Sequence, residues 1–306
     1  MKVMVFDIGG TEIKYSVMDE QLHRTDTGSV PTPQDTQEHL LNALYALYAP
    51  HKDTVEGIAV ALPGFVNNET GFLTNGGALL YNTGTPVGAR LADLCGCPVH
   101  LENDGKAAAM AELASGALQG CCNAAVFIIG TGVGGGIIAN GQLVRGRDFT
   151  AGEYSFVNTN ADAWEDEGKN MACQCSTTNL LGWYRARKGL PEDAPLNGKV
   201  FFEAANAGEP EALEVLQHFC KAVAIQIFNL TALLDVEKVA IGGGISKQPL
   251  LLETLRSAYA GLYTSRGESP YMKGFPRCEI VPCRYSSEAN QVGAMAAYLQ
   301  AVHKQV

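Results

Sequence analysis

The sequence contains one local pattern twice, and this repeat limits the possible folds more than any other feature. An apolar strand, Lys2–Asp7, leads into a glycine turn and then a second strand, Ile13–Met18. Much later, the apolar strand Ala124–Ile129 leads into GTGVGGG at 130–136, and another short strand follows. Two copies of one strand–turn–strand unit predict two related lobes, with their glycine turns facing one cleft.

Strand-like and helix-like patterns alternate through the rest of the chain. Apolar spacing predicts helices at Glu38–Tyr48, Gly105–Ser115, Pro210–Leu234, Pro249–Tyr263 and Asn290–Val302, and strands at Gly57–Leu62, Pro98–Leu101, Leu143–Val144 and Val236–Ile241. The polar stretch 158–170 is expected to be an exposed loop. This order predicts an α/β fold. We assign residues 1–118 and the C-terminal helix 290–306 to an N-terminal lobe, and residues 119–289 to a C-terminal lobe.

Composition excludes several classes of protein. The 306-residue chain has a formal net charge of −10, which argues against a nucleic-acid or anionic-membrane binder. Its apolar runs fall short of the ~18 residues that a spanning helix needs. The nine cysteines occur without a signal-peptide pattern, so we expect reduced thiols and a cytoplasmic location.

The glycine-rich stretch at 130–136 matches G-x-G-x-x-G, the dinucleotide-binding motif. That motif requires a helix to follow it, whereas Asn140-Gly141 here predicts a β-hairpin. A P-loop is also absent from the sequence, because Lys106 is followed by Ala107 rather than Ser or Thr. Neither common nucleotide motif therefore fits.

The two glycine turns, residues 8–11 and 130–136, instead fit phosphate binding by main-chain N–H groups and hydroxyls. One such turn alone would indicate only a tight hairpin. Two turns in the same relative position, the first preceded by Asp7, favour a phosphate site. The carboxylate of Asp7 further suggests a metal ion beside the phosphates.

Asp104, in LENDGKAAAMAE, follows a predicted strand and precedes a predicted helix. The simplest interpretation makes Asp104 the N-cap of that helix. However, open α/β sheets bind ligands at such strand ends, and a carboxylate there can also accept a proton. The segment AGEYSF, which contains Glu153, is uninformative when taken alone.

Taken together, these segments resemble the ROK family of sugar kinases and sugar-responsive repressors. DIGGT, LPG, ENDGKAAAMAE, GTGVGGG, AGEYSF, AIGGGIS and NQVGAMAAY occur in the order and approximate spacing of that family, over essentially the whole chain. The resemblance implies the actin/hexokinase/heat-shock-cognate fold, with two ribonuclease-H-like lobes closing on ATP and a sugar. It also implies a homodimer.

The resemblance assigns roles to individual residues. Asp104 would be the general base that takes the proton from a sugar hydroxyl, and Asp7 would position Mg²⁺ through water. ATP and its phosphates would contact Gly9, Gly10, Thr11, Lys14, Thr131, Gly132, Gly243 and Gly244, and the sugar would contact Gly64, Asn103, Asp104, Glu153 and Phe156. These roles match what phosphoryl transfer needs: a base, a metal ion and fixed donors around the γ-phosphate.

The chain departs from the family pattern in two places. Phe156 stands where G-E-x-G-H ends in a histidine that touches the sugar and binds a structural zinc. Of the zinc motif C-x-C-G-x-x-G-C-x-E the chain keeps Cys173 and Cys175, but Leu180 and Gly182 replace the third cysteine and the glutamate. Two thiolates without the histidine make a poor tetrahedral site, so no zinc site is expected.

The resemblance implies an ATP-dependent kinase acting on a hexose, an N-acetylhexosamine or a β-glucoside, usually at the 6-hydroxyl. The sequence does not identify the sugar. One alternative is a sugar-sensing repressor of the same family, but its helix-turn-helix segment would precede the first glycine turn, which here begins near residue 7. Another is an actin-like ATPase, which would not need the ENDG and GEYSF segments.

Overall fold

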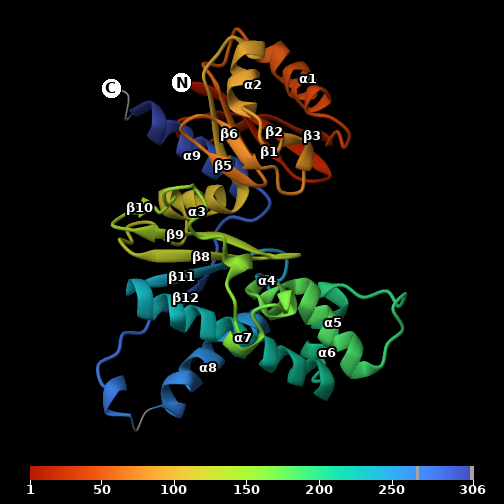
Figure 1. Ribbon diagram of the computed structural model, residues 1–306, viewed down its shortest axis with the longest axis vertical. Coiled ribbons are helices and arrows are strands. Elements are labelled where there is room, and N and C mark those ends of the chain that lie inside the picture. Colours follow the sequence, from red (N-terminus) through yellow and green to blue (C-terminus); the bar gives the residue numbers. More distant parts are fainter. Residues whose placement is uncertain (267–268, 304–306) are drawn as a thin grey trace. The chain divides into compact units, whose positions relative to one another are not determined.

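The computed structural model describes residues 1–266 and 269–303, which divide into two compact units (Figure 1). Unit 1 consists of Met1–Gly116, Leu143–Gly152 and Ser287–Val306, and unit 2 of Ala117–Gln142 and Glu153–Ser286. The sequence interpretation placed residues 143–152 in the second lobe, but their contacts place them in unit 1. Residues 143–152 therefore pack with parts of the chain that are far from them in the sequence.

Unit 1 is built on a five-stranded sheet in the order β3-β2-β1-β4-β7. Strand β1 pairs with β2 in antiparallel fashion and with β4 in parallel, and β4 pairs in parallel with β7. The strands are β1 (Lys2–Ile8), β2 (Glu12–Asp19), β3 (Arg24–Pro31), β4 (Ile58–Leu62) and β7 (Val99–Asn103), and β5 (Phe65–Asn67) with β6 (Phe72–Asn75) forms a separate hairpin. The helices are α1 (Gln37–Tyr48), α2 (Val87–Cys95), α3 (Asp104–Ser115) and α9 (Ala289–His303).

Both faces of the unit 1 sheet are covered, which explains why β1 and β4 are almost continuously apolar. One face packs Phe6 and Val60 against the apolar side of α1, including Leu40 and Leu44. The helices α3 and α9 pack so closely that only glycine fits at 293. A Cβ there would lie 1.6 Å from the carbonyl oxygen of Ala107. The C-terminal helix is thereby part of the N-terminal unit.

Unit 2 repeats the arrangement, with strand order β10-β9-β8-β11-β12. Again one antiparallel pair, β8–β9, is followed by two parallel neighbours. The strands are β8 (Ala124–Ile129), β9 (Val133–Ala139), β10 (Gln142–Leu143), β11 (Lys238–Gly242) and β12 (Glu279–Pro282), and the helices are α4 (Met171–Cys175), α5 (Thr177–Lys188), α6 (Gly198–Asn206), α7 (Pro210–Leu234) and α8 (Pro249–Ser265). The internal repeat and the α/β class expected from the sequence are confirmed.

The glycine turn of unit 2 is shorter than expected, because 133–136 is strand rather than turn. Gly135 has a φ of +141°, and a Cβ there would lie 1.9 Å from the carbonyl oxygen of Val126 and 3.0 Å from the ring of Tyr154. The Tyr154 hydroxyl donates to the Gly136 carbonyl at 3.0 Å. These glycines therefore make room for a buried tyrosine across the strand.

Several elements had no clear signal in the sequence. Strand β3 is a polar, largely exposed edge strand, so it lacks the apolar pattern of its neighbours. The loop expected at 158–170 contains two short 3₁₀ helices. The 3₁₀ helices are η1 (Ala49–His51), η2 (Leu80–Asn82), η3 (Tyr154–Phe156), η4 (Ala161–Ala163), η5 (Glu167–Lys169) and η6 (Pro270–Met272).

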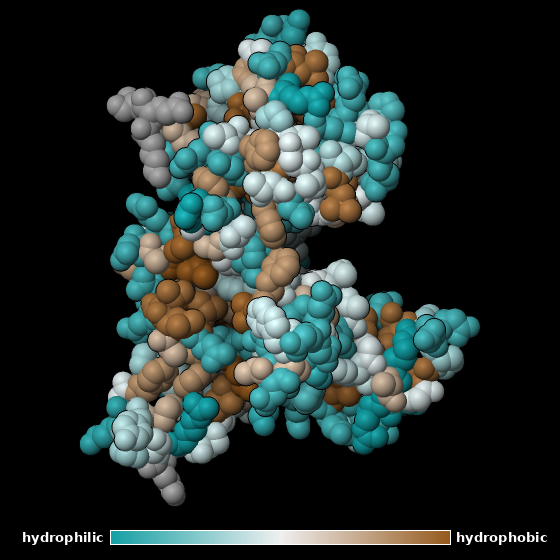
Figure 2. Space-filling view, viewed as in Figure 1, coloured by the Kyte–Doolittle hydropathy of each residue, from teal (hydrophilic) through white to brown (hydrophobic). Residues whose placement is uncertain are grey.

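The core of unit 2 lies between its sheet and the helices α4–α8. Figure 1 shows α7 and α8 side by side along the sheet. Figure 2 shows hydrophobic residues gathered over β9, β8 and β11 on one face of this unit, whereas hydrophilic residues predominate over α1 and α2. Among the residues that the structure describes, none of the helices has the length and apolar character needed to span a membrane.

Candidate functional site

The first glycine turn joins β1 to β2, and its carbonyl groups accept hydrogen bonds from two nearby residues, Thr32 and Gln34. Thr32 donates from its hydroxyl to the Gly9 carbonyl at 2.8 Å and from its main-chain N–H to the Thr11 carbonyl at 3.0 Å. Gln34 donates to the Gly10 carbonyl at 2.6 Å. The Gly9 N–H donates to the Glu12 carbonyl at 2.9 Å, so the N–H groups of Gly10 and Thr11 are the ones considered for a phosphate.

Asp7 precedes this turn on β1 and is buried. Its Oδ1 accepts a hydrogen bond from Asn290 at 2.9 Å, and its Oδ2 lies 3.9 Å from Nζ of Lys14. Burial raises the pKa of Asp7, and the Asn290 hydrogen bond and the Lys14 charge oppose that rise. A buried carboxylate with a raised pKa gains from a nearby cation.

Asp7 fits Mg²⁺ as a single carboxylate. In the described residues, no group of three or more His, Cys, Asp or Glu side chains could hold a metal ion. Mg²⁺ usually keeps several waters and binds through one or two carboxylates together with phosphate oxygens. The residues around the first turn therefore suit an ion that arrives with a nucleotide.

Asp104 is the first residue of α3, directly after β7. The N-cap of α3 is Asn103, whose Oδ1 accepts from the Lys106 N–H at 3.0 Å, so the interpretation of Asp104 as N-cap is wrong. Oδ1 of Asp104 accepts from the Gly105 N–H at 2.8 Å and from the Asn103 amide at 3.1 Å. Because Asn103 satisfies the helix terminus, the Asp104 carboxylate is oriented without serving as the cap.

Gly64 belongs to the same cluster of unit 1. Its carbonyl oxygen accepts from Nδ2 of Asn103 at 3.0 Å. Gly64 has a φ of +105°, and a Cβ there would lie 2.1 Å from the carbonyl oxygen of Asn75. Only glycine therefore fits this position, and hydrogen bonds of Asn103 join Gly64 and Asp104, the three residues that the resemblance assigns to the sugar.

The second turn, Gly130 to Gly132, joins β8 to β9 in unit 2. The Gly130 N–H donates to the Gly132 carbonyl at 3.0 Å, and the Gly130 carbonyl accepts from the Thr177 N–H at 2.9 Å. Thr177 begins α5, so the start of that helix holds the turn in place. The sequence interpretation did not single out Thr177.

Ser155 is a second residue that the sequence interpretation missed. Its hydroxyl donates to the Val133 carbonyl at 2.9 Å and accepts from the Val133 N–H at 3.3 Å, directly after the turn. A signal for it existed, because Ser155 stands where G-E-x-G-H has its second glycine. The AGEYSF segment is therefore hydrogen-bonded to Val133, the residue after the second glycine turn, within unit 2.

Glu153 and Phe156 lie at the two ends of η3. The Phe156 N–H donates to the Glu153 carbonyl at 3.2 Å. Between them, Tyr154 is buried against Phe127, with ring centroids 4.6 Å apart. Phe156 is 70% exposed on unit 2. Tyr154 thus anchors the short helix η3, at whose ends Glu153 and Phe156 lie.

Gly243 follows β11 and lies beside the end of β8. It has a φ of +96°, and a Cβ there would lie 2.1 Å from the carbonyl oxygen of Ile129, next to the Gly130 turn. The Gly243 carbonyl accepts from the Ser246 hydroxyl at 2.8 Å. The structure therefore places Gly243 against Ile129, the residue before the second glycine turn.

The remnants of the zinc motif lie in and after α4. Cys173 is partly buried and Cys175 is buried, and burial raises the pKa of the Cys175 thiol to about 12. Zinc binds thiolate rather than thiol, so this environment is unfavourable for a ligand. Leu180 is fully buried in the unit 2 core.

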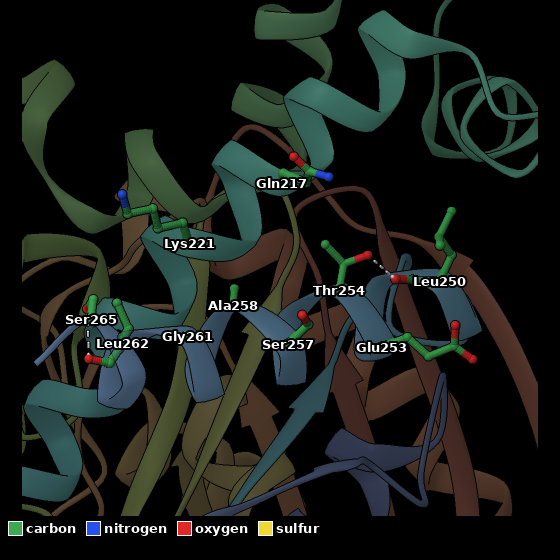
Figure 3. Close-up of a pocket in the computed structure, with 10 residues that line it drawn as sticks. All are labelled: Gln217, Lys221, Leu250, Glu253, Thr254, Ser257, Ala258, Gly261, Leu262 and Ser265. Carbon is green, nitrogen blue, oxygen red and sulfur yellow. Dashed lines mark hydrogen bonds between the residues drawn. The ribbon is translucent and has the colours of Figure 1, made fainter. Parts of the chain in front are cut away.

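A cavity of about 540 Å³ lies between α7 and α8, on another part of unit 2 (Figure 3). Its lining includes Gln217 and Lys221 of α7 and Glu253 and Ser257 of α8, and Thr254 donates to a carbonyl of its own helix. None of the residues predicted for phosphate or sugar binding lines it. This cavity is separate from the candidate site.

Comparison with protein families and curated proteins identifies similar chains. The model of the ROK family matches residues 3–301. A beta-glucoside kinase from Klebsiella pneumoniae is 31% identical over 85% of this chain and 87% of its own. An N-acetyl-D-glucosamine kinase from Vibrio atlanticus (strain LGP32) is 33% identical over 82% of this chain and 86% of its own.

Two solved structures are similar over almost the whole chain. A ROK family protein from Streptococcus pneumoniae TIGR4, in complex with sucrose, has a TM-score of 0.87 and 30% identity and covers 100% of both chains. A ROK family glucokinase from Streptomyces griseus, in complex with glucose and AMPPNP, has a TM-score of 0.79 and 26% identity over 98% of this chain and 100% of that one. The expected fold is confirmed.

Proposed function

Because the chain belongs to the ROK family, we propose that it transfers the γ-phosphoryl group of ATP to a sugar hydroxyl. The observation that carries this proposal is the oriented Asp104 carboxylate at the β7–α3 junction, fixed by Asn103 and Gly105. A carboxylate held in this way suits proton abstraction from a hydroxyl. The curated relatives named as sugar kinases support the same activity.

In this mechanism Asp104 takes the proton as the sugar oxygen attacks phosphorus. Because its Oδ1 accepts two hydrogen bonds, the carboxylate keeps one orientation while the nucleophile is aligned. Gly64 and Asn103 adjoin it in unit 1 and would contact sugar hydroxyls, and Glu153 and Phe156 of unit 2 would add further contacts. These sugar contacts are proposals.

The phosphates would be held by the two glycine turns, Gly9 to Thr11 with Lys14, and Thr131 with Gly132. Gly243 and Gly244 would contact the nucleotide as well. Asp7 would hold Mg²⁺ through water, and the ion, when bound, neutralises charge on the β- and γ-phosphates. The AMPPNP in the glucokinase structure supports ATP as donor.

For the acceptor we propose a hexose, an N-acetylhexosamine or a β-glucoside, phosphorylated at the 6-hydroxyl. The named relatives include a beta-glucoside kinase and an N-acetyl-D-glucosamine kinase. A homodimer and a cytoplasmic location also remain predictions. A coupled assay across these three sugar classes would identify the acceptor.

Replacing Asp104 by Asn tests the proposed base. Asp104→Asn keeps a hydrogen-bonding side chain, so sugar affinity should stay within a few-fold, whereas kcat should fall by ~10²–10⁴, as is typical when a general base is lost. Asp93→Asn, at an exposed position on α2, is the matched control and should leave kcat unchanged. Near-normal turnover by Asp104→Asn would assign the base to another group.

The two alternatives give different results with the unmodified protein. A sugar-sensing regulator would bind sugar without forming a phosphorylated product in the same assay. An actin-like ATPase would form filaments with ATP in a sedimentation run, and it would not depend on sugar. Sugar-dependent ADP release from discrete oligomers supports the kinase.

A further inference from the structure

The buried carboxylate of Glu102 lies directly before the Asn103–Asp104 pair, and an arginine from a distant part of the chain neutralises it. The Glu102 side chain is 1% exposed and the Arg145 side chain 19%. Nε and Nη2 of Arg145 both donate to Oε2 of Glu102, at 3.1 and 2.8 Å. Two donors on one oxygen make this a charge-assisted, geometrically defined pair.

The other oxygen of Glu102 is also engaged. Oε1 accepts from the main-chain N–H of Asn103 at 3.1 Å. Asn103 in turn donates to Oδ1 of Asp104 and to the Gly64 carbonyl, and it caps α3. An unbroken series of hydrogen bonds therefore runs from the Arg145 guanidinium to the Asp104 carboxylate, all within unit 1.

Arg145 is itself fixed at the start of the segment that leads to Glu153. Its carbonyl oxygen accepts from the Ala151 N–H at 3.1 Å, which closes the loop between them. The next arginine, Arg147, is 95% exposed and lies 3.9 Å from Asp148, so it takes no part in the pair. The chain thus offers two arginines in one loop, Arg145 partly buried beside Glu102 and Arg147 exposed to solvent.

We propose that Arg145 is a positioning residue for phosphoryl transfer, which holds Asp104 in its reactive orientation through Glu102 and Asn103. This inference rests on the proposed function. Without Arg145, the buried Glu102 carboxylate would lose the guanidinium that pairs with it, and breaking a buried ion pair is strongly unfavourable. Glu102 would then change its position, and the Asn103 N–H would lose a fixed acceptor.

Arg145→Met, with Arg147→Met as matched control, tests the proposal by kinetics. Small displacements of a catalytic group cost up to ~10²-fold in rate, so Arg145→Met should lower kcat by ~10–10²-fold and leave the KM for ATP within about twofold. The double variant Arg145→Met/Glu102→Gln removes the buried charge and keeps an acceptor for the Asn103 N–H. It should recover most of the lost kcat.

Amide hydrogen exchange at Asn103 tests the geometry independently of catalysis. Exchange there should rise at least ~tenfold in Arg145→Met, return in the double variant and stay unchanged in Arg147→Met. If Arg145→Met does not accumulate as folded protein, Arg145→Lys carries the same comparison, because a lysine cannot donate from two fixed nitrogens.

Three results would overturn the inference: unchanged exchange at Asn103, raised exchange with unchanged kcat, or an effect confined to KM. A wild-type protein that phosphorylates no sugar would refute the proposed function instead. In that case the exchange measurement alone still decides whether Arg145 fixes the Asp104 junction.

Discussion

The side-chain amide of Asn290 donates a 2.9 Å hydrogen bond to Oδ1 of Asp7, although the two residues lie 283 positions apart. Asn290 stands in the first turn of α9, and Asp7 stands on β1 immediately before the first glycine turn. The bond favours the ionised form of a carboxyl group whose pKa burial raises. The C-terminal helix thus contributes to the proposed metal-binding group at the other end of the chain.

Removing this hydrogen bond should therefore change the pH dependence of the reaction. In Asn290→Ala the pKa of Asp7 rises further, so the acid limb of the pH profile of kcat/KM for Mg-ATP should move to higher pH. Gln291→Ala, which removes the neighbouring buried amide of α9, is the control. It should leave the acid limb of the kcat/KM profile at the same pH as in wild type. An unchanged acid limb in Asn290→Ala would remove Asp7 from the ionisation that controls activity.

Phe156 should lower the discrimination between sugars. A site that hydrogen-bonds a sugar hydroxyl rejects analogues lacking it, because its own polar group is then left unpaired. The 70% exposed ring of Phe156 offers an apolar face instead of a donor, which suits an aglycone or an acetamido group. Glucose, N-acetylmannosamine and a β-glucoside should thus have closer kcat/KM values in wild type than in Phe156→His.

The control for that comparison is Trp164→His, which changes another exposed aromatic residue of unit 2. It should leave the ratios of kcat/KM unchanged. If glucose is preferred by more than ~10²-fold in both wild type and Phe156→His, the ring has no part in specificity.

Purified protein should contain well under one zinc ion per chain. Phe156 offers no ligand atom, and burial raises the pKa of the Cys175 thiol to about 12, so the thiolate that zinc requires is scarce. Elemental analysis should confirm this, and a chelator should leave Tm unchanged. Stoichiometric, tightly held zinc would show that Cys173 and Cys175 have further partner ligands.

His100 should make the protein less stable at mildly acidic pH. Burial, followed by the nearby charge of Arg145, lowers its pKa from 6.5 to about 4. Between these two values the unfolded chain takes up a proton that the folded chain does not, so the free energy of unfolding falls as pH decreases. From pH 7.5 to 5 the loss from His100 is about 2 kcal/mol.

Urea unfolding of wild type and His100→Gln at pH 7.5 and pH 5 measures how much His100 contributes to the pH dependence of the free energy of unfolding. The variant should show a smaller loss on acidification than wild type, by about the same 2 kcal/mol. Equal losses in the two proteins would mean that His100 is protonated in the folded state near its ordinary pKa.

Local pattern determined much of the architecture. The helix predicted at Pro210–Leu234 has the same bounds as α7, and both strand–turn–strand units are present as antiparallel pairs. Residues close in sequence make these elements, and their apolar periodicity is visible in the chain itself. Asn103 and Asp104 could be placed at a strand–helix junction for the same reason.

Tertiary structure decided the contacts that act on those residues. The sequence did not indicate that Arg145 neutralises Glu102, that Asn290 reaches Asp7, or that residues 143–152 belong to unit 1. A glycine run also concealed the start of β9, because those glycines accommodate Tyr154 from a later segment. Such pairings depend on how distant segments pack, and buried charges and close approaches appear only once the chain has folded.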